Sequence, residues 1–229
     1  MERRRSYGDG CAFAQALDLV GDRWAMLVMR ELMFGPRRFS DLRRALPGIA
    51  TNVLAQRLAG LEAGGVVEAV ERPGGGPAYG LTPWGRAFRE PMRVMGAWAA
   101  RSPCLSFEHP LSAASAMLSL GSMFDPDRAG ALRVSIDLRL PDGEFCVVVT
   151  EGELTVEAGA CGEADAVVTG DQMAVLGVLY MGADPAAAGL RVEGDPTALA
   201  RLAAAFRSPE PLLASGAAPA RGSRSAASP

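Results

Sequence analysis

The side chains best suited to bind another molecule are concentrated between residues 37 and 57. Asparagine, glutamine and arginine can each make paired hydrogen bonds to the edges of DNA bases, and arginine also binds phosphate groups. The residues whose types suit such paired or single hydrogen bonds to bases are Thr51, Asn52, Gln56 and Arg57. For Arg57, solvation or a salt bridge is the alternative role. The residues expected near the DNA backbone are Arg37, Arg38, Ser40, Arg43, Arg44 and, in a glycine-rich loop, Arg72.

The distribution of charge along the chain separates two regions. Residues 1–101 contain 15 arginines and 10 acidic residues, a charge of +5, whereas residues 102–229 contain 8 arginines and 16 acidic residues, a charge of −8. The sum is the net charge of −3, and every basic residue is an arginine. A basic region followed by an acidic one indicates two domains with different partners, the first of them a polyanion. For the acidic region, a solvated surface is the simpler interpretation.

The cysteine and histidine content argues against a metal centre, a cofactor or an enzyme. The four cysteines are Cys11, Cys104, Cys146 and Cys161. They form no CxxC pair, so we expect neither a disulfide framework nor a structural zinc site. The single histidine, His109, removes most metal-binding and acid–base arrangements. A signal peptide and a run of about 18 apolar residues are both missing, so we expect a cytoplasmic, nucleoid-associated protein without membrane contact.

Helices must position the polar residues. Apolar residues at helical spacing predict two helices over residues 11–34, the second of them capped by Asp22. Ser40 is the expected N-cap of a short helix over 41–46. A further helix is expected over 51–63, with its leucines facing inward and its polar residues facing outward.

A hairpin and a long helix are expected after these helices. Residues 66–71 and 78–81 are strand candidates, and the loop between them is rich in glycine. Thr82 and Pro83 have the types that cap and open a helix. Large apolar residues then recur every three or four positions as far as Trp98, which predicts one continuous helix.

The order of these elements is that of a winged helix-turn-helix, and the residues resemble the HxlR family of bacterial regulators. The matching segments are Cys11, 16–24 (ALDLVGDRW), 30–44 (RELMFGPRRFSDLRR), 46–49 (LPGI), 52–58 (NVLAQRL) and 81–86 (LTPWGR). The resemblance implies a homodimer whose 51–63 helices read a pseudo-palindromic operator in the major groove. It also implies protomer contacts, for which the candidates are Phe13, Leu17, Trp84, Phe88, Met92, Met95 and Trp98. Burial in the core is the alternative for Trp84 and Phe88.

Cys11 has two possible roles. It matches the position of a thiol that senses oxidants or electrophiles in some members of the family. The alternative is a small apolar residue at the start of a helix. If Cys11 is a sensor, the chain is a thiol-based redox regulator whose second domain serves as a scaffold or lipid carrier.

The second region has a strand-rich pattern. The expected strands cover residues 132–140, 144–150, 154–157, 164–169 and 190–192. The first four are expected to form an antiparallel meander. Two helices are expected in addition, one capped by Asp171 and one capped by Asp195 with Pro196 at its first position.

This pattern, with the ending Glu193-Gly194-Asp195, resembles the sterol carrier protein fold. The resemblance implies an apolar tunnel between a sheet and helices, which makes the domain a sensor of a hydrophobic small molecule. The candidate lining residues are Phe145, Val147, Leu154, Val156, Met173, Leu176, Leu179, Tyr180 and Phe206, and plain core packing is their alternative role. A carrier or dimerisation module without an effector is the competing function, and an enzyme is the third.

The expected fold class is therefore α+β, with a winged helix-turn-helix domain followed by a sterol-carrier-like antiparallel sheet with helices. The expected boundaries are 1–101 for the DNA-binding domain, 102–129 for a connector with a short helix, 130–207 for the second domain and 208–229 for a disordered tail. We expect a transcriptional regulator that binds double-stranded DNA as a homodimer, uses no cofactor or metal, and responds to a hydrophobic effector.

Overall fold

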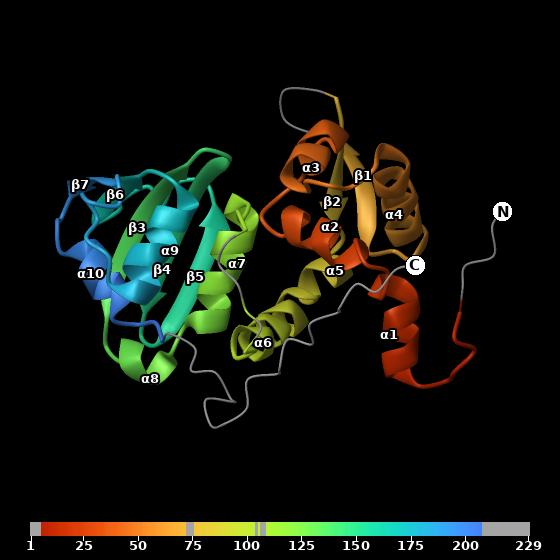
Figure 1. Cartoon of the computed structure of the whole chain (residues 1–229), viewed down its shortest axis with the longest axis horizontal. Helices are drawn as coiled ribbons and strands as arrows, with labels where there is room; N and C mark the ends of the chain where they lie inside the picture. Colours follow the sequence, from red (N-terminus) through yellow and green to blue (C-terminus); the bar gives the residue numbers. More distant parts are fainter. Residues whose placement is uncertain (1–5, 72–75, 104, 106–108, 208–229) are drawn as a thin grey trace, which may run out of the picture.

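The computed structural model describes residues 6–71, 76–103, 105 and 109–207, which form two lobes lying side by side (Figure 1). Each lobe has its own cluster of buried apolar residues. Both helices and sheet are present, as expected for an α+β chain. Arg72, Cys104 and the expected tail over 208–229 lie outside the described residues.

Four helices build most of the first lobe, namely α1 (Ala12–Val20), α2 (Ala25–Leu32), α3 (Phe39–Ala45) and α4 (Thr51–Ala63). Along α4, Leu54, Leu58 and Leu61 recur on one face and are buried, as the helical spacing predicts. Strands β1 (Val67–Glu71) and β2 (Pro77–Leu81) pair in an antiparallel hairpin. The order of α3, α4 and hairpin confirms the predicted winged helix-turn-helix.

Two expected helix caps of the first lobe are wrong. Helix α2 begins at Ala25 without a side-chain cap, and Asp22 forms an ion pair with Arg57 instead. Ser40 lies inside α3, whose N-cap position is occupied by Arg38. Most helical stability in proteins comes from packing of an apolar face, so burial in the core sets both starts more strongly than a local cap.

The single long helix expected after Thr82 is divided into two helices, α5 (Pro83–Ala87) and α6 (Arg89–Ala100). Pro91 explains the break, because it has no N–H to donate to the carbonyl of Ala87 and its ring crowds that carbonyl. The expected N-cap of the first of these helices is confirmed, since the Thr82 side chain accepts a hydrogen bond of 3.0 Å from the N–H of Gly85.

A five-stranded sheet forms the second lobe, with the order β5-β4-β3-β6-β7. Its strands are β3 (Arg133–Leu140), β4 (Gly143–Thr150), β5 (Glu153–Ala158), β6 (Ala166–Thr169) and β7 (Arg191–Gly194). Strands β3 to β5 form the expected antiparallel meander. The expectation that the fourth strand continues this meander is wrong, because β6 pairs parallel to β3. A parallel neighbour requires a connection that crosses the sheet, and residues 159–165 provide it.

The remaining helices are α7 (Ala113–Met123), α8 (Pro126–Ala129), α9 (Gln172–Met181) and α10 (Ala198–Ala203). The Asp171 cap is confirmed, since its carboxylate accepts a hydrogen bond of 2.7 Å from the N–H of Met173. The Asp195 cap is wrong, because α10 begins three residues later and the carboxylate instead binds Thr197 and Arg201. Every helix in the described ranges is too short or too polar to span a lipid bilayer.

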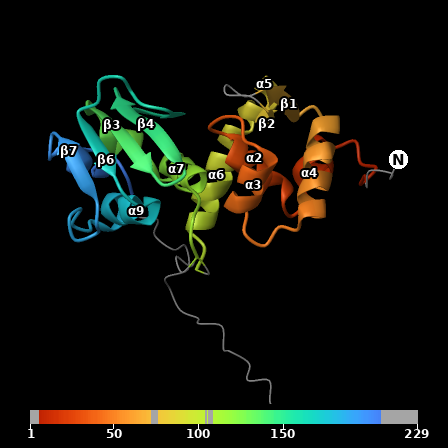
Figure 2. The same cartoon turned by 90° about the horizontal axis from the view of Figure 1, so that it is seen from above.

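Helix α7 joins the two lobes, because it belongs to the second core and also packs against α2 and α6 (Figure 2). Glycine at position 96 lets α6 and α7 approach closely, because a Cβ atom there would lie 2.5 Å from Ser122 Oγ and would displace that side chain. Phe34 and Phe145 meet edge to face across the junction, with ring centroids 5.4 Å apart. Arg89 donates to the carbonyls of Met33 and Val156, each at 3.2 Å, and burial between the lobes lowers the pKa of its guanidinium.

Candidate nucleic-acid interface

Three of the expected base-contacting residues lie on the outer face of α4. Thr51, Asn52 and Gln56 are exposed, whereas the leucines of the same helix are buried. Asn52 and Gln56 are four residues apart, so their side chains point from the same face of the helix. Helix α4 lies at the end of the first lobe that is remote from the second lobe (Figures 1 and 2). Its polar face can therefore approach a large ligand without obstruction by the second lobe.

Arg57 differs from these residues, because its side chain is only 21% exposed. Its guanidinium is paired with Asp22 and also donates to Gln56 Oε1 at 3.2 Å. The salt bridge named above as the alternative is therefore the observed arrangement. Through the pair with Asp22, Arg57 ties α4 to the turn between α1 and α2. Through its hydrogen bond to Gln56, it orients the Gln56 side chain.

The basic residues around α3 fall into two groups. Arg38, Arg43 and Arg44 are exposed, as is Ser40. Arg43 Nη1 lies 3.4 Å from Thr51 Oγ1, and Arg44 is paired with Asp41 at 2.6 Å. Arg43 therefore borders the polar face of α4, so candidate base and phosphate contacts meet there, whereas Arg44 lines the junction of the lobes.

Arg37 belongs to the second group, since its guanidinium turns inward. Arg37 Nη1 lies 3.5 Å from Glu31 Oε2, and its backbone bridges Tyr79 of β2. Glu31 is fully buried, pairs with Arg30 at 2.8 Å and accepts a hydrogen bond of 2.7 Å from Ser112 Oγ. We did not expect a role for Glu31, although an acidic residue beside Leu32 in the apolar stripe of α2 was a visible signal.

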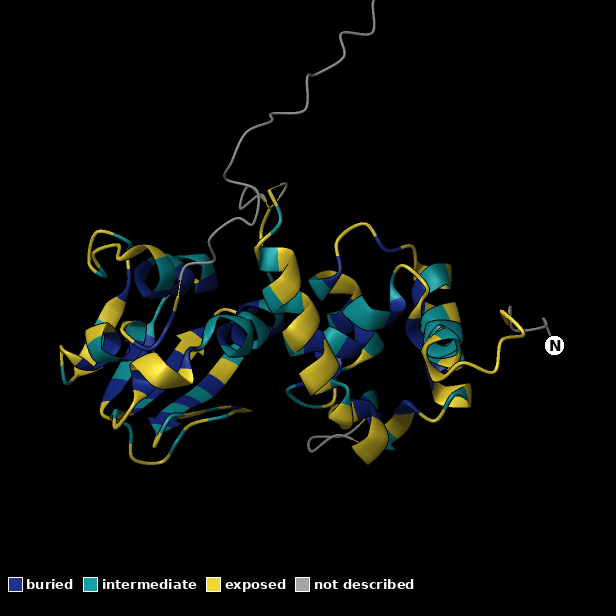
Figure 3. Ribbon diagram, turned by 90° about the horizontal axis from the view of Figure 1, so that it is seen from below, coloured by how far each residue is buried: buried dark blue, intermediate teal, exposed yellow. Residues whose placement is uncertain are grey.

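Exposed apolar side chains mark a second surface of the first lobe. They belong to α1, α5 and α6, and they are Phe13, Trp84, Val94, Met95 and Trp98. A groove of about 240 Å³ lies beside them, lined by apolar residues of α1 and α5 and by the start of α6. Helix α6, between the lobes, shows a broad exposed surface (Figure 3).

The other expected dimer residues are less accessible. Leu17 and Phe88 are half-buried, and Met92 is buried and belongs to the core of its own lobe. Met92 is therefore a core residue of its own protomer, and its contact with a partner stays a prediction. Met92 is turned inward because the break at Phe88 starts a new helix, whose inner face includes this residue.

Cys11 is exposed and occupies the N-cap position of α1. Hydrogen bonds from the backbone N–H groups of Ala14 and Phe13 lower the pKa of its thiol. These N–H groups point out of the first turn of a helix, where they stabilise a negative charge. Cys11 is therefore predisposed to form a thiolate.

The expected pocket residues of the second lobe are packed together in its core. Phe145, Val147, Val156, Leu176, Leu179 and Phe206 are buried there, and Leu154 and Tyr180 pack against them. Met173 is half-buried. A cavity of about 580 Å³ lies instead at the junction of the lobes, where Phe34, Arg37, Asp41 and Arg44 face Asp142, Glu144 and Phe145. Of the nine expected lining residues, Phe145 alone touches this cavity.

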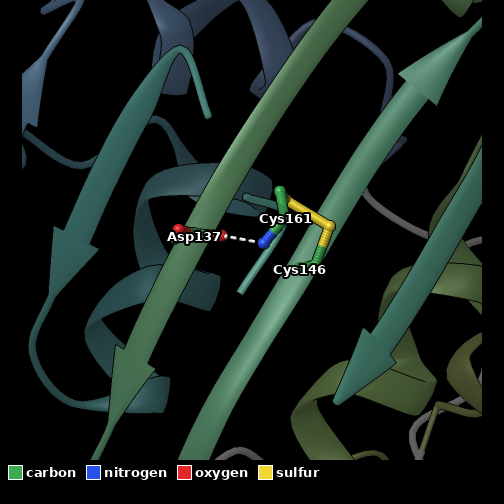
Figure 4. A group of neighbouring side chains, drawn as sticks. All are labelled: Asp137, Cys146 and Cys161. Carbon is green, nitrogen blue, oxygen red and sulfur yellow. Dashed lines mark hydrogen bonds between the residues drawn. A yellow bond between two sulfur atoms is a disulfide. The ribbon is translucent and has the colours of Figure 1, made fainter. Parts of the chain in front are cut away.

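A disulfide joins Cys146 and Cys161, 15 residues apart in the sequence, so the expectation of no disulfide is wrong (Figure 4). Their Cα atoms are 4.9 Å apart. Absence of a CxxC pair did not exclude it, because the 159–165 connection brings Cys161 over strand β4. Asp137 lies beside the pair, and its Oδ1 accepts a hydrogen bond of 2.7 Å from the N–H of Cys161.

Two protein families match different parts of the chain. Residues 19–103 match the family described as HxlR-like helix-turn-helix. Residues 110–212 match the family described as alkyl sulfatase C-terminal. The second match does not confirm the expected sterol-carrier resemblance, although the expected mixture of sheet and helices is present.

Individual relatives match the first lobe. The uncharacterized HTH-type transcriptional regulator YtfH of Escherichia coli (strain K12) is 34% identical over 94 residues, which cover 40% of this chain and 75% of that protein. YvaP of Bacillus subtilis (strain 168), another uncharacterized HTH-type regulator, is 34% identical over 89 residues, 38% of this chain and 82% of YvaP. The HTH-type transcriptional regulator YodB of Bacillus subtilis (strain 168) is 37% identical over 86 residues, 37% of this chain and 77% of YodB.

Proposed function

Because this chain belongs to the HxlR-like helix-turn-helix family of transcriptional regulators, we propose that α4 reads a DNA operator from the major groove. The observation that carries this proposal is the division of α4 into a buried leucine face and an exposed polar face. Asn52 and Gln56 offer paired hydrogen bonds to adenine, and Thr51 can bond several bases or contact a thymine methyl group.

Arg38 and Arg43 are proposed to hold phosphates of the DNA backbone, because both are exposed at α3 and Arg43 lies 3.4 Å from Thr51 of α4. Arg37 and Arg57 have a different role in the proposal. Each is bound to a carboxylate of its own chain, so each orients the reading surface rather than contacting DNA. The basic charge of the first region supplies the long-range attraction to DNA.

Selection of bound genomic fragments tests this assignment. Wild-type protein should enrich one pseudo-palindromic sequence, and Asn52→Ala with Gln56→Ala should remove that enrichment. Each lost contact is expected to cost about 1–3 kcal/mol, roughly 5- to 150-fold in operator affinity. Weak binding that depends on salt should remain, because the phosphate contacts are intact.

Arg43→Ala is the matched comparison for this experiment. It should weaken binding to all fragments by a similar factor without altering the preferred sequence. The slope of log affinity against log salt concentration should become shallower by about one. If the double variant retains the wild-type sequence preference, α4 does not read bases through these residues.

We further propose that two protomers associate through the exposed apolar residues of α1, α5 and α6. Apolar residues grouped on the outside of a helical lobe are typical of a surface that another chain covers. A twofold dimer would present two copies of α4 to successive turns of the major groove. This arrangement matches the pseudo-palindrome proposed for the operator.

The second lobe is proposed as the input domain, which binds a hydrophobic small molecule. Its packing against the first lobe supports this role, because Phe145 of β4 contacts Phe34 and the junction cavity also touches α3. A ligand can alter DNA binding only if its affinity differs between the binding-competent and incompetent arrangements. An apolar ligand of the second core satisfies that condition when it shifts the Phe34–Phe145 contact and, through it, the position of α3.

Cys11 is the competing input, favoured by its exposure and by the lowered pKa of its thiol. A thiolate reacts with oxidants and electrophiles far faster than a thiol. In that case, modification at the start of α1 would act on the proposed dimer surface, which includes Phe13 of the same helix.

Operator binding distinguishes the two inputs. If Cys11 is the input, diamide should release wild-type protein from DNA and leave Cys11→Ser bound. Alkylation of Cys11 should also rise at a lower pH than that of an unperturbed cysteine, because its thiolate forms earlier. If the second lobe is the input, both proteins should respond equally to an apolar molecule extracted from natively purified chain, and neither should respond to diamide.

A further inference from the structure

The face of the second sheet that is opposite to its helices carries a cluster with its own chemistry. Buried apolar residues of β3 and β4 alternate with residues that point to this opposite face, which include Asp137 and Cys146. Strand β5 lies at one edge of the sheet and β6 lies beyond β3, so the connection over 159–165 must cross β4 and β3. Its attachment to Cys146 shows that it crosses on this face.

Three potential metal ligands converge under that connection. Asp137 and Cys146 are paired opposite each other on β3 and β4. Cys161 belongs to the connection over 159–165 and is bonded to Cys146 (Figure 4). One carboxylate oxygen and the two sulfur atoms all lie within 4.8 Å of one another. This spacing is compatible with a single ion bound among them after modest side-chain rotation.

Asp137 provides an independent reason to expect a cation. Its side chain is 8% exposed, yet it forms no ion pair with any residue in the described ranges. A buried carboxylate without a positive partner is unfavourable, and a bound cation relieves that cost. The hydrogen bond from the Cys161 N–H engages Oδ1 and leaves Oδ2 available for a ligand.

We propose that reduction of the Cys146–Cys161 disulfide creates a binding site for a thiophilic divalent cation of the Zn²⁺ type. A dithiol supplies two electrons and two protons, so the S–S bond becomes two thiols and the dithiol becomes a cyclic disulfide. The cation then displaces the two thiol protons and binds both sulfurs and one oxygen of Asp137. Two thiolates and a carboxylate suit zinc and cadmium, with water in the fourth position.

The site is separate from the proposed DNA-reading surface, but it adjoins the junction of the lobes. Cys146 is next in sequence to Phe145, which contacts Phe34 of the first lobe. Cys161 lies in a connection without regular structure, so it can move away from Cys146 as the disulfide opens. In the disulfide form, the sulfur atoms of Cys146 and Cys161 are bonded to each other and do not bind metal. In the dithiol form, both sulfur atoms are available as ligands.

Cadmium titration tests the site in full-length protein carrying Cys11→Ser and Cys104→Ser, which removes the other two thiols. After dithiothreitol treatment and desalting without air, one Cd²⁺ per chain should generate an ultraviolet thiolate-to-cadmium band. Zn²⁺ should displace Cd²⁺ and abolish the band. The unreduced protein should show no band, and Cys146→Ser should lose it.

Asp137→Asn is the test of the carboxylate, because asparagine retains an oxygen that accepts from the Cys161 N–H. It should weaken Cd²⁺ binding at least as much as loss of an outer-shell partner of a metal ligand does, which is about 10- to 100-fold. Glu163→Gln, an exposed change in the same connection, is the matched control and should leave Cd²⁺ affinity unchanged. Circular dichroism of each reduced variant verifies that the fold persists, and protection of two thiols from a thiol reagent by Cd²⁺ gives a second readout. Absence of the band in folded, reduced protein overturns the proposal, as does unchanged affinity in Asp137→Asn.

Discussion

Trp98→Glu is expected to convert the dimer into monomers and to lower operator affinity by about 100-fold or more. Trp98 is 75% exposed on α6, so glutamate is compatible with the folded protomer. In the proposed dimer, the same position would bury a carboxylate in an apolar contact, which is strongly unfavourable. A monomer engages one half-site, and loss of the linked second half-site removes an avidity of about 10²–10⁴.

Sedimentation and operator titration measure the two parts of this prediction. Met181→Glu is the matched control, because Met181 is 80% exposed but lies at the end of α9 in the second lobe. It adds the same charge to an exposed apolar site outside the proposed interface. A Trp98→Glu protein that remains dimeric would falsify the assignment of this surface. A monomer with undiminished operator affinity would contradict the need for two half-sites.

Helix α4 shows which features of the first lobe are readable from sequence. Its leucines recur at helical spacing, so the buried face and the outward residues Asn52 and Gln56 follow from the pattern alone. The roles of Arg37 and Arg57 did not follow. Their carboxylate partners, Glu31 and Asp22, are chosen by tertiary packing, and local spacing carries no information on which charge will be turned inward.

One error had a signal that was visible in the sequence. Pro91 lies inside the expected long helix, and its missing N–H breaks that helix at Phe88. The short hairpin after Leu140 fixes Asp137 opposite Cys146, because each strand advances one residue per position on either side of the turn. The arrival of Cys161 was not predictable, since it depends on where a seven-residue connection crosses the sheet.

The position of the disulfide and of the proposed cation site depends on the same topology. A meander of four antiparallel strands would leave Cys161 beyond the edge of the sheet, remote from Cys146. The parallel pairing of β6 with β3 instead draws the connection back over β4. One change of strand order therefore accounts for the wrong fourth strand, the unexpected disulfide and the proposed cation site.

Glu31→Ala is expected to lower the free energy of unfolding by about 3 kcal/mol, which corresponds to a decrease in Tm of roughly 6–12 °C for a chain of this size. Glu31 is fully buried and is bound by Arg30, Arg37 and Ser112. Alanine would remove the carboxylate that pairs with the guanidinium groups of Arg30 and Arg37, and it would remove the hydrogen bond from Ser112 at the start of α7. The cost lies at the lower end for buried ion pairs, because both arginines retain contact with water.

Denaturant unfolding of three variants tests this assignment. Glu31→Gln should lose less stability than Glu31→Ala, because the amide oxygen still accepts from Ser112 and fills the same space. Glu62→Ala, an exposed change on α4, should alter stability by less than about 0.5 kcal/mol. Equal stability of Glu31→Ala and Glu62→Ala would mean that the buried carboxylate does not hold the lobes together. Because the Ser112 contact crosses the junction, the loss in Glu31→Ala should also separate the unfolding transitions of the two lobes.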